Sequence, residues 1–319
     1  MQVALLSCGR MAEYSIGVDL GGTNLRAAAV TRGGEIIQKI AGATDLKDGH
    51  DAVISDMVNS INALKQTCGD GMLAGVGIGV PGFIDMGKGV IMNSNNLPDF
   101  NGYPVREEIE NRLGTPIFLE NDANAAALGE KWAGAGRDVD DLILLTLGTG
   151  IGGGIVTDGK ILHGFMGMAG EIGHITVNPT GNPCGCGNYG CLEKHTSATA
   201  ISAMARLIQL GDELTSKEVY EMAVAGEPRA KQIFQTVGGY LGIALATMIN
   251  LFNFPLYLLS GGVLGAWDQF APAMFAEVEK RSFTFRNSKT RIDKAVLGDE
   301  AGLIGAAALP FQALRAGGR

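Results

Sequence analysis

The chain has 319 residues, of which 46% are hydrophobic and 18% charged, a balance that excludes an intrinsically disordered protein. Its formal net charge of −8 argues against a broad nucleic-acid-binding surface, which needs lysine and arginine to neutralise phosphates. Since the sequence holds no apolar run of about 18 residues, we expect no transmembrane helix and a cytoplasmic location.

The N-terminal stretch MQVALLSCG has too short an apolar part for a secretory signal peptide, and no basic segment precedes it. We interpret residues 1–10 as a tail and Met11 as a candidate natural start. The next stretch, SIGVDLGGTNLRAAAV (15–30), predicts a strand, a glycine turn and a second strand. Apolar residues at helical spacing predict a helix over 51–66, with Asp51 as its N-cap.

Strands continue to alternate with helices along the rest of the chain, which predicts an α/β protein. The stretch at 142–157 repeats the strand, glycine turn and strand of 15–30, so the pattern indicates two related halves. The other expected strands are 35–42, 73–85, 115–122, 254–265 and 292–298. The other expected helices are 103–114, 123–134, several between 196 and 252, 266–281 and 300–314.

Glycine-rich turns end several of the expected strands. Two of them match G-x-G-x-x-G (77–82 and 148–153), but no helical pattern follows either, which argues against a Rossmann dinucleotide site. Hairpin turns with exposed amide groups can instead bind phosphate, and Asp19 at a strand end can hold Mg²⁺ through water. We expect Gly21 and Gly22 to take positive φ there. The candidate nucleotide contacts are Asp19, Gly21, Gly22, Thr23, Asn24, Thr149, Gly150, Gly261 and Gly262.

The segment 173–195 concentrates cysteine and histidine in the spacing His174-x9-Cys184-x-Cys186-x4-Cys191. Three cysteines and one histidine form a known structural zinc combination. On spacing alone His195 competes as the fourth ligand, and a disulfide from Cys191 to either of the other cysteines is an alternative that leaves an odd thiol. The Cys-Gly-Cys spacer is too short for a redox C-x-x-C motif.

The sequence ENDAN (120–124) places Asn121 and Asp122 where a strand gives way to a helix. Active-site residues in α/β proteins are common at the carboxyl ends of strands. A carboxylate at this position can equally cap the helix. From the residues alone, both interpretations of Asp122 stay open.

Together these motifs resemble a known family. DLGGTN, LGTGIGGG and SGG look like the two phosphate motifs and the adenosine motif of the sugar kinase, heat-shock 70 and actin superfamily. AGEIGH (169–174) followed by CGCGNYGCLE (184–193) resembles the signature of the ROK family, which contains repressors, open reading frames and kinases. The resemblance spans roughly residues 14–310.

The resemblance implies a two-domain actin-like ATPase fold of the ribonuclease H-like type, with an active-site cleft between the domains. We expect a smaller domain from residues 13–122 and 300–319, and a larger domain from 123–299 that carries the zinc site. The implied activity is ATP-dependent phosphorylation of a hexose, glucose above all, at its 6-hydroxyl with Mg²⁺. A homodimer, structural Zn²⁺ and no nucleic-acid or membrane partner are also implied.

The resemblance assigns Asp122 as the catalytic base. The implied sugar contacts are Gly82, Asn96, Asn121, Asp122, Glu171, His174 and Glu193. The implied zinc ligands are His174, Cys184, Cys186 and Cys191. Phe165, Met166 and Phe100 depart from the family's usual residues, and we expect all three near the sugar entrance.

Other sugars and other functions stay open at this stage. N-acetylglucosamine, N-acetylmannosamine, mannose or fructose are alternative acceptors, and polyphosphate is an alternative donor. A sugar-responsive repressor is a different class of protein, but about 14 residues before the first strand are too few for the helix-turn-helix of such relatives. A zinc-dependent binding module without catalysis is the third hypothesis.

Overall fold

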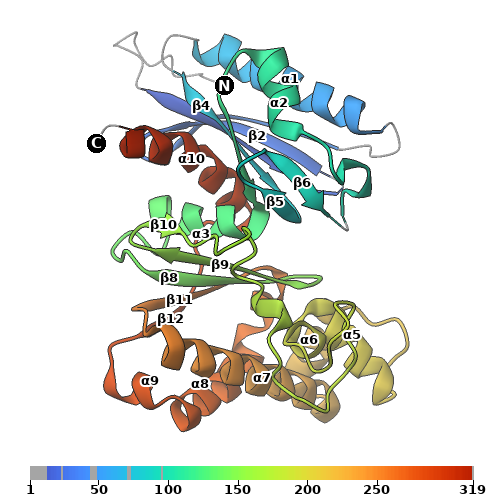
Figure 1. Cartoon of the computed structure of the whole chain (residues 1–319). Helices are drawn as coiled ribbons and strands as arrows, with labels where there is room; N and C mark the ends of the chain where they lie inside the picture. The colour runs from blue at the N-terminus through green and yellow to red at the C-terminus, as the bar shows by residue number, and fades with distance from the viewer. Residues whose placement is uncertain (1–12, 23, 44–48, 70–72, 95, 318–319) are drawn as a thin grey trace, which may run out of the picture. The chain divides into compact units, whose positions relative to one another are not determined.

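The computed structural model describes residues 13–22, 24–43, 49–69, 73–94 and 96–317 (Figure 1). The chain divides into two compact units. The first contains the described residues up to Ala133 and those from Glu300 onward, and the second is Gly134–Asp299. We expected the division after residue 122. It falls later because helix α3 (Asp122–Ala133) packs along the C-terminal helix α10 (Ala301–Gly317), which belongs to the first unit.

Among the described residues of the first unit, five strands form one sheet in the order β3-β2-β1-β4-β7. The first three strands are antiparallel neighbours, whereas β4 and β7 run parallel to β1. Helices α1 and α2 cover one face of this sheet, and α10 covers the other (Figure 1). The elements before α3 are β1 (Tyr14–Leu20), β2 (Asn24–Thr31), β3 (Ile36–Ala43), α1 (Gly49–Cys68), β4 (Leu73–Val80), the hairpin β5 (Phe83–Asp85) and β6 (Val90–Asn93), a 3₁₀ turn (Pro98–Phe100), α2 (Val105–Leu113) and β7 (Ile117–Asn121).

The second unit, whose residues are all described, repeats this plan. Its sheet has the order β10-β9-β8-β11-β12, with β11 and β12 parallel to β8. The prediction of two related halves is therefore confirmed. The elements are β8 (Leu142–Leu147), β9 (Ile151–Thr157), β10 (Lys160–Ile161), a 3₁₀ turn (Ile172–His174), α4 (Glu193–Thr196), α5 (Ala198–Leu207), α6 (Ser216–Val224), α7 (Pro228–Phe252), β11 (Leu256–Ser260), a 3₁₀ helix (Gly262–Ala266), α8 (Trp267–Arg281), α9 (Phe283–Asn287) and β12 (Arg291–Lys294).

Helix α7 is the longest apolar helix among the described residues. Its length and its mean hydropathy of 1.3 would allow it to cross a membrane. Its apolar side chains, however, form the core of the second unit together with α8 and the sheet, and 61% of the apolar window is buried. This burial is typical of the core helix of a globular domain.

One local prediction was wrong. Helix α1 begins at Gly49, two residues earlier than expected, so Asp51 lies inside the first turn and is not the N-cap. A carboxylate in the first turn still interacts favourably with the positive end of the helix dipole.

Small residues allow α10 to lie directly on the sheet and on α3. A Cβ added at Gly77 of β4 would lie 1.9 Å from the carbonyl oxygen of Ala306. A Cβ added at Gly305 of α10 would lie 1.6 Å from the carbonyl oxygen of Ala125 in α3. The backbones therefore approach so closely that neither position has room for a side chain. This packing fixes the start of α3, where Asp122 lies.

We therefore expect Gly305→Ala to lower the free energy of unfolding by about 2 kcal/mol or more, the usual range for overpacking a core. The matched control is Gly239→Ala in α7, where an added Cβ meets no atom within 4 Å. Alanine should stabilise that helix by up to about 1 kcal/mol through its higher helix propensity. Urea denaturation of both variants measures the difference. Equal midpoints would show that the α3–α10 contact tolerates a side chain.

Candidate functional site

The turn between β1 and β2 is a tight hairpin closed by the N–H of Gly21, which donates to the carbonyl oxygen of Asn24 at 2.8 Å. Contrary to our expectation, neither Gly21 nor Gly22 adopts a positive φ, because the turn closes with ordinary backbone angles. A Cβ added at Gly22 would lie 3.5 Å from the carbonyl oxygen of Asn96, so the turn lies beside this candidate sugar residue. Thr23 lies outside the described residues.

Asp19 is the second-to-last residue of β1 and lies just before this turn. Its carboxylate forms an ion pair with Arg26 of β2, directly opposite in the antiparallel register. The start of α10 also approaches it, because a Cβ added at Gly302 would lie 3.8 Å from either carboxylate oxygen. The sequence analysis did not identify Arg26, although a positive charge two residues after Asn24 in the expected hairpin could have indicated a partner for Asp19. The pair places a neutralised but polar group at the end of β1.

The junction of β7 and α3 is organised by Asn121. Its side-chain oxygen accepts the N–H groups of Ala123 and Asn124 at 3.0 and 3.2 Å, which caps the helix. Its side-chain nitrogen donates to the carbonyl oxygen of Gly82 at 3.2 Å. Asn121 therefore accepts two N–H groups of the first turn, and Asp122 Oδ1 shares one of them, because it also accepts the N–H of Ala123 at 2.9 Å.

Asp122 is the first residue of α3, and its side chain is exposed. The surrounding protein raises the pKa of Asp122 to about 6, chiefly by desolvation, with a further contribution from the negative charge of Asp19. Because water still reaches the side chain, we expect the shift to be smaller than in a sealed cavity. A carboxylate with a raised pKa is a stronger proton acceptor than an ordinary aspartate.

Two buried polar residues support this junction from behind. Glu120 is 1% exposed and accepts the side-chain N–H of Asn124 at 3.0 Å and the backbone N–H of Asn121 at 2.9 Å. Asn124 is 2% exposed. Sequence reasoning overlooked both, although they belong to the same ENDAN motif. They fix the backbone that presents Asn121 and Asp122.

In the second unit, the equivalent turn joins β8 to β9. The N–H of Gly148 donates to the carbonyl oxygen of Gly150 at 3.0 Å, which leaves Thr149 at the tip. At the end of β11, Gly261 has a φ of +95°, and an added Cβ would lie 2.4 Å from the carbonyl oxygen of Leu147. Glycine is therefore required at this position. The turn after β8, expected to bind phosphate, and the turn after β11, expected to bind adenosine, lie side by side.

A cavity of about 660 Å³ opens beside Thr149 and Gly150. Apolar side chains of α5 form much of its wall, and Lys194 adds a positive charge. The lining residues are Thr149, Gly150, Asn182, Pro183, Glu193, Lys194, Ser197, Thr199, Ala200, Ala203, Met204 and Leu207.

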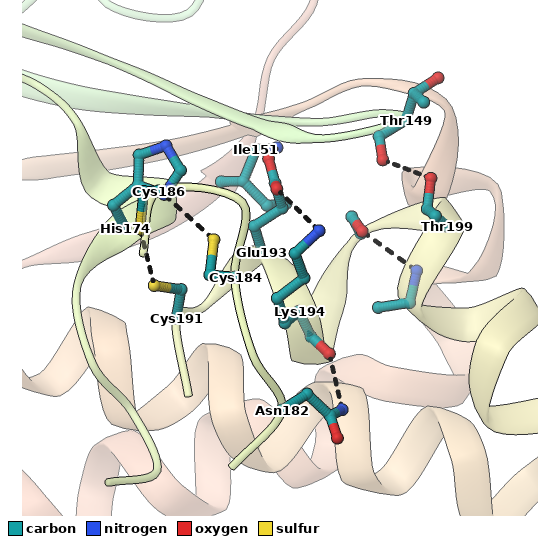
Figure 2. A network of polar contacts seen from close by, with 12 residues as sticks. Thr149, Ile151, His174, Asn182, Cys184, Cys186, Cys191, Glu193, Lys194 and Thr199 are labelled. Carbon is teal, nitrogen blue, oxygen red and sulfur yellow. Dashed lines mark hydrogen bonds and ion pairs between the residues drawn. The ribbon is translucent and has the colours of Figure 1, made fainter. Parts of the chain in front are cut away.

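The structure gathers His174, Cys184, Cys186 and Cys191 into one cluster, with all four candidate ligand atoms within 4.8 Å of one another (Figure 2). The Sγ atoms of Cys186 and Cys191 are 3.7 Å apart, and Cys184 Sγ lies 3.6 Å from His174 Nδ1. Tetrahedral zinc with Zn–S bonds near 2.3 Å separates its sulfur ligands by about 3.7 Å. The donor set and its spacing therefore fit zinc.

His195 does not take part in this cluster. It lies in α4, where its buried ring packs against Tyr240 with centroids 4.2 Å apart. Burial lowers its pKa, which favours the neutral ring. Between the two histidines left open by spacing, the structure thus selects His174.

The candidate sugar residues of the second unit lie around the cluster. With Nδ1 of His174 directed to Cys184, its Nε2 faces the Glu171 carboxylate at 3.8 Å. Burial raises the pKa of Glu171, and the nearby charge of Glu193 raises it further, whereas His174 opposes the shift. Glu193 Oε2 accepts the N–H of Ile151 at 3.1 Å. Two carboxylates and an imidazole therefore converge on one place beside the glycine turn.

The three residues that depart from the family's usual form differ in their exposure to solvent. Phe165 is 100% and Met166 63% exposed. Phe100, in contrast, is 1% exposed in the core of the first unit, where its ring contacts those of His50 and Tyr103. The expectation that Phe100 lies at a sugar entrance was therefore wrong, because the 3₁₀ turn directs it inward.

Two sheets of one topology, each with a glycine turn after its first strand, define a two-domain α/β protein of the actin-like ATPase type. The chain belongs to the ROK family, whose family model matches residues 15–313. It is 38% identical to a glucokinase of Halalkalibacterium halodurans over 311 residues, which cover 92% of this chain and 93% of the relative.

Solved structures agree with this assignment. A ROK hexokinase from Thermus thermophilus matches with a TM-score of 0.86 and 33% identity, covering 95% of this chain and 99% of that one. A ROK family glucokinase from Streptomyces griseus, in complex with glucose and AMPPNP, matches with a TM-score of 0.74 and 32% identity. That match covers 94% of this chain and 99% of the other.

The raised pKa of Asp122 has a consequence for stability. The folded state disfavours the ionised carboxylate, so the penalty is present above about pH 6 and disappears as the pH falls towards the ordinary value of 3.8. Asp122→Asn keeps a side-chain oxygen but removes the charge. We expect this variant to melt at a higher temperature than the wild type at pH 8, and at the same temperature near pH 4. A constant difference across this range would contradict the assigned shift.

Proposed function

We propose that this chain is an ATP-dependent hexose kinase that phosphorylates glucose at its 6-hydroxyl. The observation that carries the proposal is Asp122, a carboxylate that directly follows β7 and has a raised pKa, while Asn121 accepts two N–H groups at the start of the helix. The similarity to glucokinases over nearly the whole chain favours glucose as the acceptor.

In the proposed reaction, Asp122 accepts the proton of the 6-hydroxyl as that oxygen attacks the γ-phosphorus of ATP. A bond forms between the sugar oxygen and phosphorus, the bond to the bridging oxygen breaks, and ADP leaves. Mg²⁺, when bound, neutralises charge on the phosphates, and Asp19 would hold it through water. The phosphates are assigned to the turns at Gly21–Asn24 and Thr149–Gly150, and adenosine to Gly261 and Gly262.

The proposed sugar site uses groups that can both donate and accept hydrogen bonds. Asn121 keeps one amide hydrogen beyond its bond to Gly82, and Asn96 lies beside the turn at Gly22. In the second unit, Glu171, Glu193 and His174 are assigned to further hydroxyls. A site that pairs each hydroxyl rejects epimers, because an unmatched buried polar group is costly.

We assign structural zinc to His174, Cys184, Cys186 and Cys191. Four protein ligands complete a tetrahedral shell, which is typical of a structural rather than a hydrolytic site. Zinc on Nδ1 would fix the tautomer of His174 and keep a hydrogen on Nε2. That N–H, 3.8 Å from Glu171, could then be shared with a sugar hydroxyl.

Alternative acceptors are N-acetylglucosamine, N-acetylmannosamine, mannose and fructose, and polyphosphate is an alternative donor. A sugar-sensing regulator would bind sugar without turnover, so ADP release with glucose separates it from a kinase. We also propose a homodimer in the cytoplasm. Sedimentation analysis of the purified chain tests the dimer.

Replacing the proposed base tests the function. We expect Asp122→Asn to lower kcat by about 100-fold or more, the usual contribution of general base catalysis, while the Kd for a nucleotide analogue stays the same. In the wild type, kcat/KM for glucose should fall as the pH drops through about 6, because the base must be ionised. Near-normal turnover by the variant would exclude Asp122 as the base.

Removing a metal ligand tests the zinc assignment. We expect elemental analysis to give about one zinc per chain in the wild type and a loss of it in Cys186→Ala. The matched control is Cys68→Ala, since Cys68 is buried in α1 outside the cluster and should leave zinc unchanged. KM for glucose should rise in the first variant because His174 loses its fixed orientation. A zinc-free wild type with full activity would contradict the assignment.

A further inference from the structure

The turn that carries Thr149 and Gly150 is held from outside by the segment 193–199 (Figure 2). Glu193 Oε2 accepts the N–H of Ile151 at 3.1 Å. The hydroxyl of Thr199 donates to the carbonyl oxygen of Thr149 at 2.8 Å. A third bond runs from the N–H of Ala198 to the carbonyl oxygen of Gly148, also at 2.8 Å. The segment thus bonds to three of the four residues 148–151, in addition to the bond that closes the turn from the N–H of Gly148 to the carbonyl oxygen of Gly150.

The space at Gly150 adds to the evidence for the Glu193 contact. A Cβ at this position would lie 2.5 Å from Glu193 Oε2, so any side chain would displace the carboxylate from Ile151. The glycine is therefore needed for contact with Glu193, beyond any role of its own amide in binding phosphate. The absence of a side chain at Gly150 therefore leaves room for the carboxylate of Glu193 against the turn.

The segment 193–199 begins two residues after the cluster ligand Cys191. Leu192, between them, is fully buried, and its N–H donates at 2.9 Å to the carbonyl oxygen of Ile175, the residue after His174. The chain next to His174 and the chain next to Cys191 are thus joined where the segment 193–199 begins. If the loop around the cluster lost its order, the effect could pass to the turn 148–151 along the short stretch from Cys191 to Thr199.

The two carboxylate oxygens of Glu193 can contact two different groups, the turn and a bound sugar. Oε2 bonds to Ile151, whereas Oε1 lies 3.6 Å from the Lys194 ammonium, which is too far for a strong hydrogen bond. Oε1 can therefore accept a sugar hydroxyl without breaking the contact with the turn. Sugar bound there would hold the carboxylate, and through it the turn, in one position.

We propose that 193–199 is a coupling segment, in which Glu193 and Thr199 are positioning residues that hold the turn 148–151 ready for the phosphates of a nucleotide. The identity of these ligands rests on the proposed function; the coupling itself rests on the bonds described above. Two consequences follow. Glucose and nucleotide bind with positive cooperativity, and loss of the metal loosens the turn as well as the metal loop.

Thr199→Val tests the coupling segment directly, because it removes one hydroxyl from an exposed position and keeps the shape of the side chain. We expect nucleotide-analogue binding, measured by calorimetry, to weaken about threefold to tenfold, the usual effect of one lost hydrogen bond. Amides 148–152 should exchange hydrogen faster, while zinc content and glucose affinity stay unchanged. The matched control is Thr236→Val, which removes a hydroxyl bonded within α7 at 2.9 Å and should change none of these quantities.

Hydrogen exchange in Cys186→Ala tests whether loss of the metal loosens the turn 148–151. We expect faster exchange at 148–152 in addition to 184–191, and no change in β11. Exchange confined to 184–191, or an unchanged turn in Thr199→Val, would overturn the proposal.

These outcomes are separate from those that test the kinase assignment. If the wild type phosphorylates glucose but the variants leave the turn and the nucleotide affinity unchanged, the coupling is wrong and the kinase stands. If the wild type binds neither glucose nor nucleotide, the proposed function fails, and exchange at 148–152 still decides whether the segment holds the turn.

Discussion

The capping of α3 by the Asn121 side chain is the interaction on which the proposed chemistry depends. A helix N-terminus has unsatisfied N–H groups, and the nearest carboxylate would ordinarily accept them. Here an amide oxygen takes that role at 3.0 and 3.2 Å, and the buried Glu120 and Asn124 hold the junction in place. Asp122 accepts one of these N–H groups, that of Ala123, at 2.9 Å, and its pKa is raised although this bond opposes the shift. The packing of α10 on α3 fixes where this carboxylate lies within its unit.

The second unit contains a long loop, between β10 and α4, that has little regular secondary structure. The segment between β10 and α4 forms no long strand or helix, and backbone hydrogen bonds such as that from the N–H of Leu192 to the carbonyl oxygen of Ile175 give it part of its order. Three thiols and an imidazole at zinc-like spacing add to that order, and the same loop supplies His174 and Glu193 to the proposed sugar site. Glu193 then contacts the glycine turn through Ile151. The proposed metal ligands and the sugar residues of the second unit thus belong to one stretch, 171–193, which contacts the turn assigned to phosphate.

Local sequence patterns predicted much of the fold because they report local physics. The alternation of strands and helices and the repeated strand–turn–strand unit follow from periodicity and turn chemistry. The spacing of the cysteines likewise predicted the cluster, although it left His174 and His195 as rivals. The structure decides between them because α4 buries His195 against Tyr240.

What the sequence could not show was which distant groups meet. Nothing local indicates that Phe100 turns into the core, that α3 packs with α10, or that Thr199 bonds to the carbonyl oxygen of Thr149. The central claim, that the chain transfers phosphate to glucose, is tested most directly by ³¹P NMR of the wild-type protein with glucose, ATP and Mg²⁺. The account predicts equal amounts of ADP and a phosphate ester at the 6-position of glucose. ADP accompanied by free phosphate, or no turnover with glucose, would contradict it.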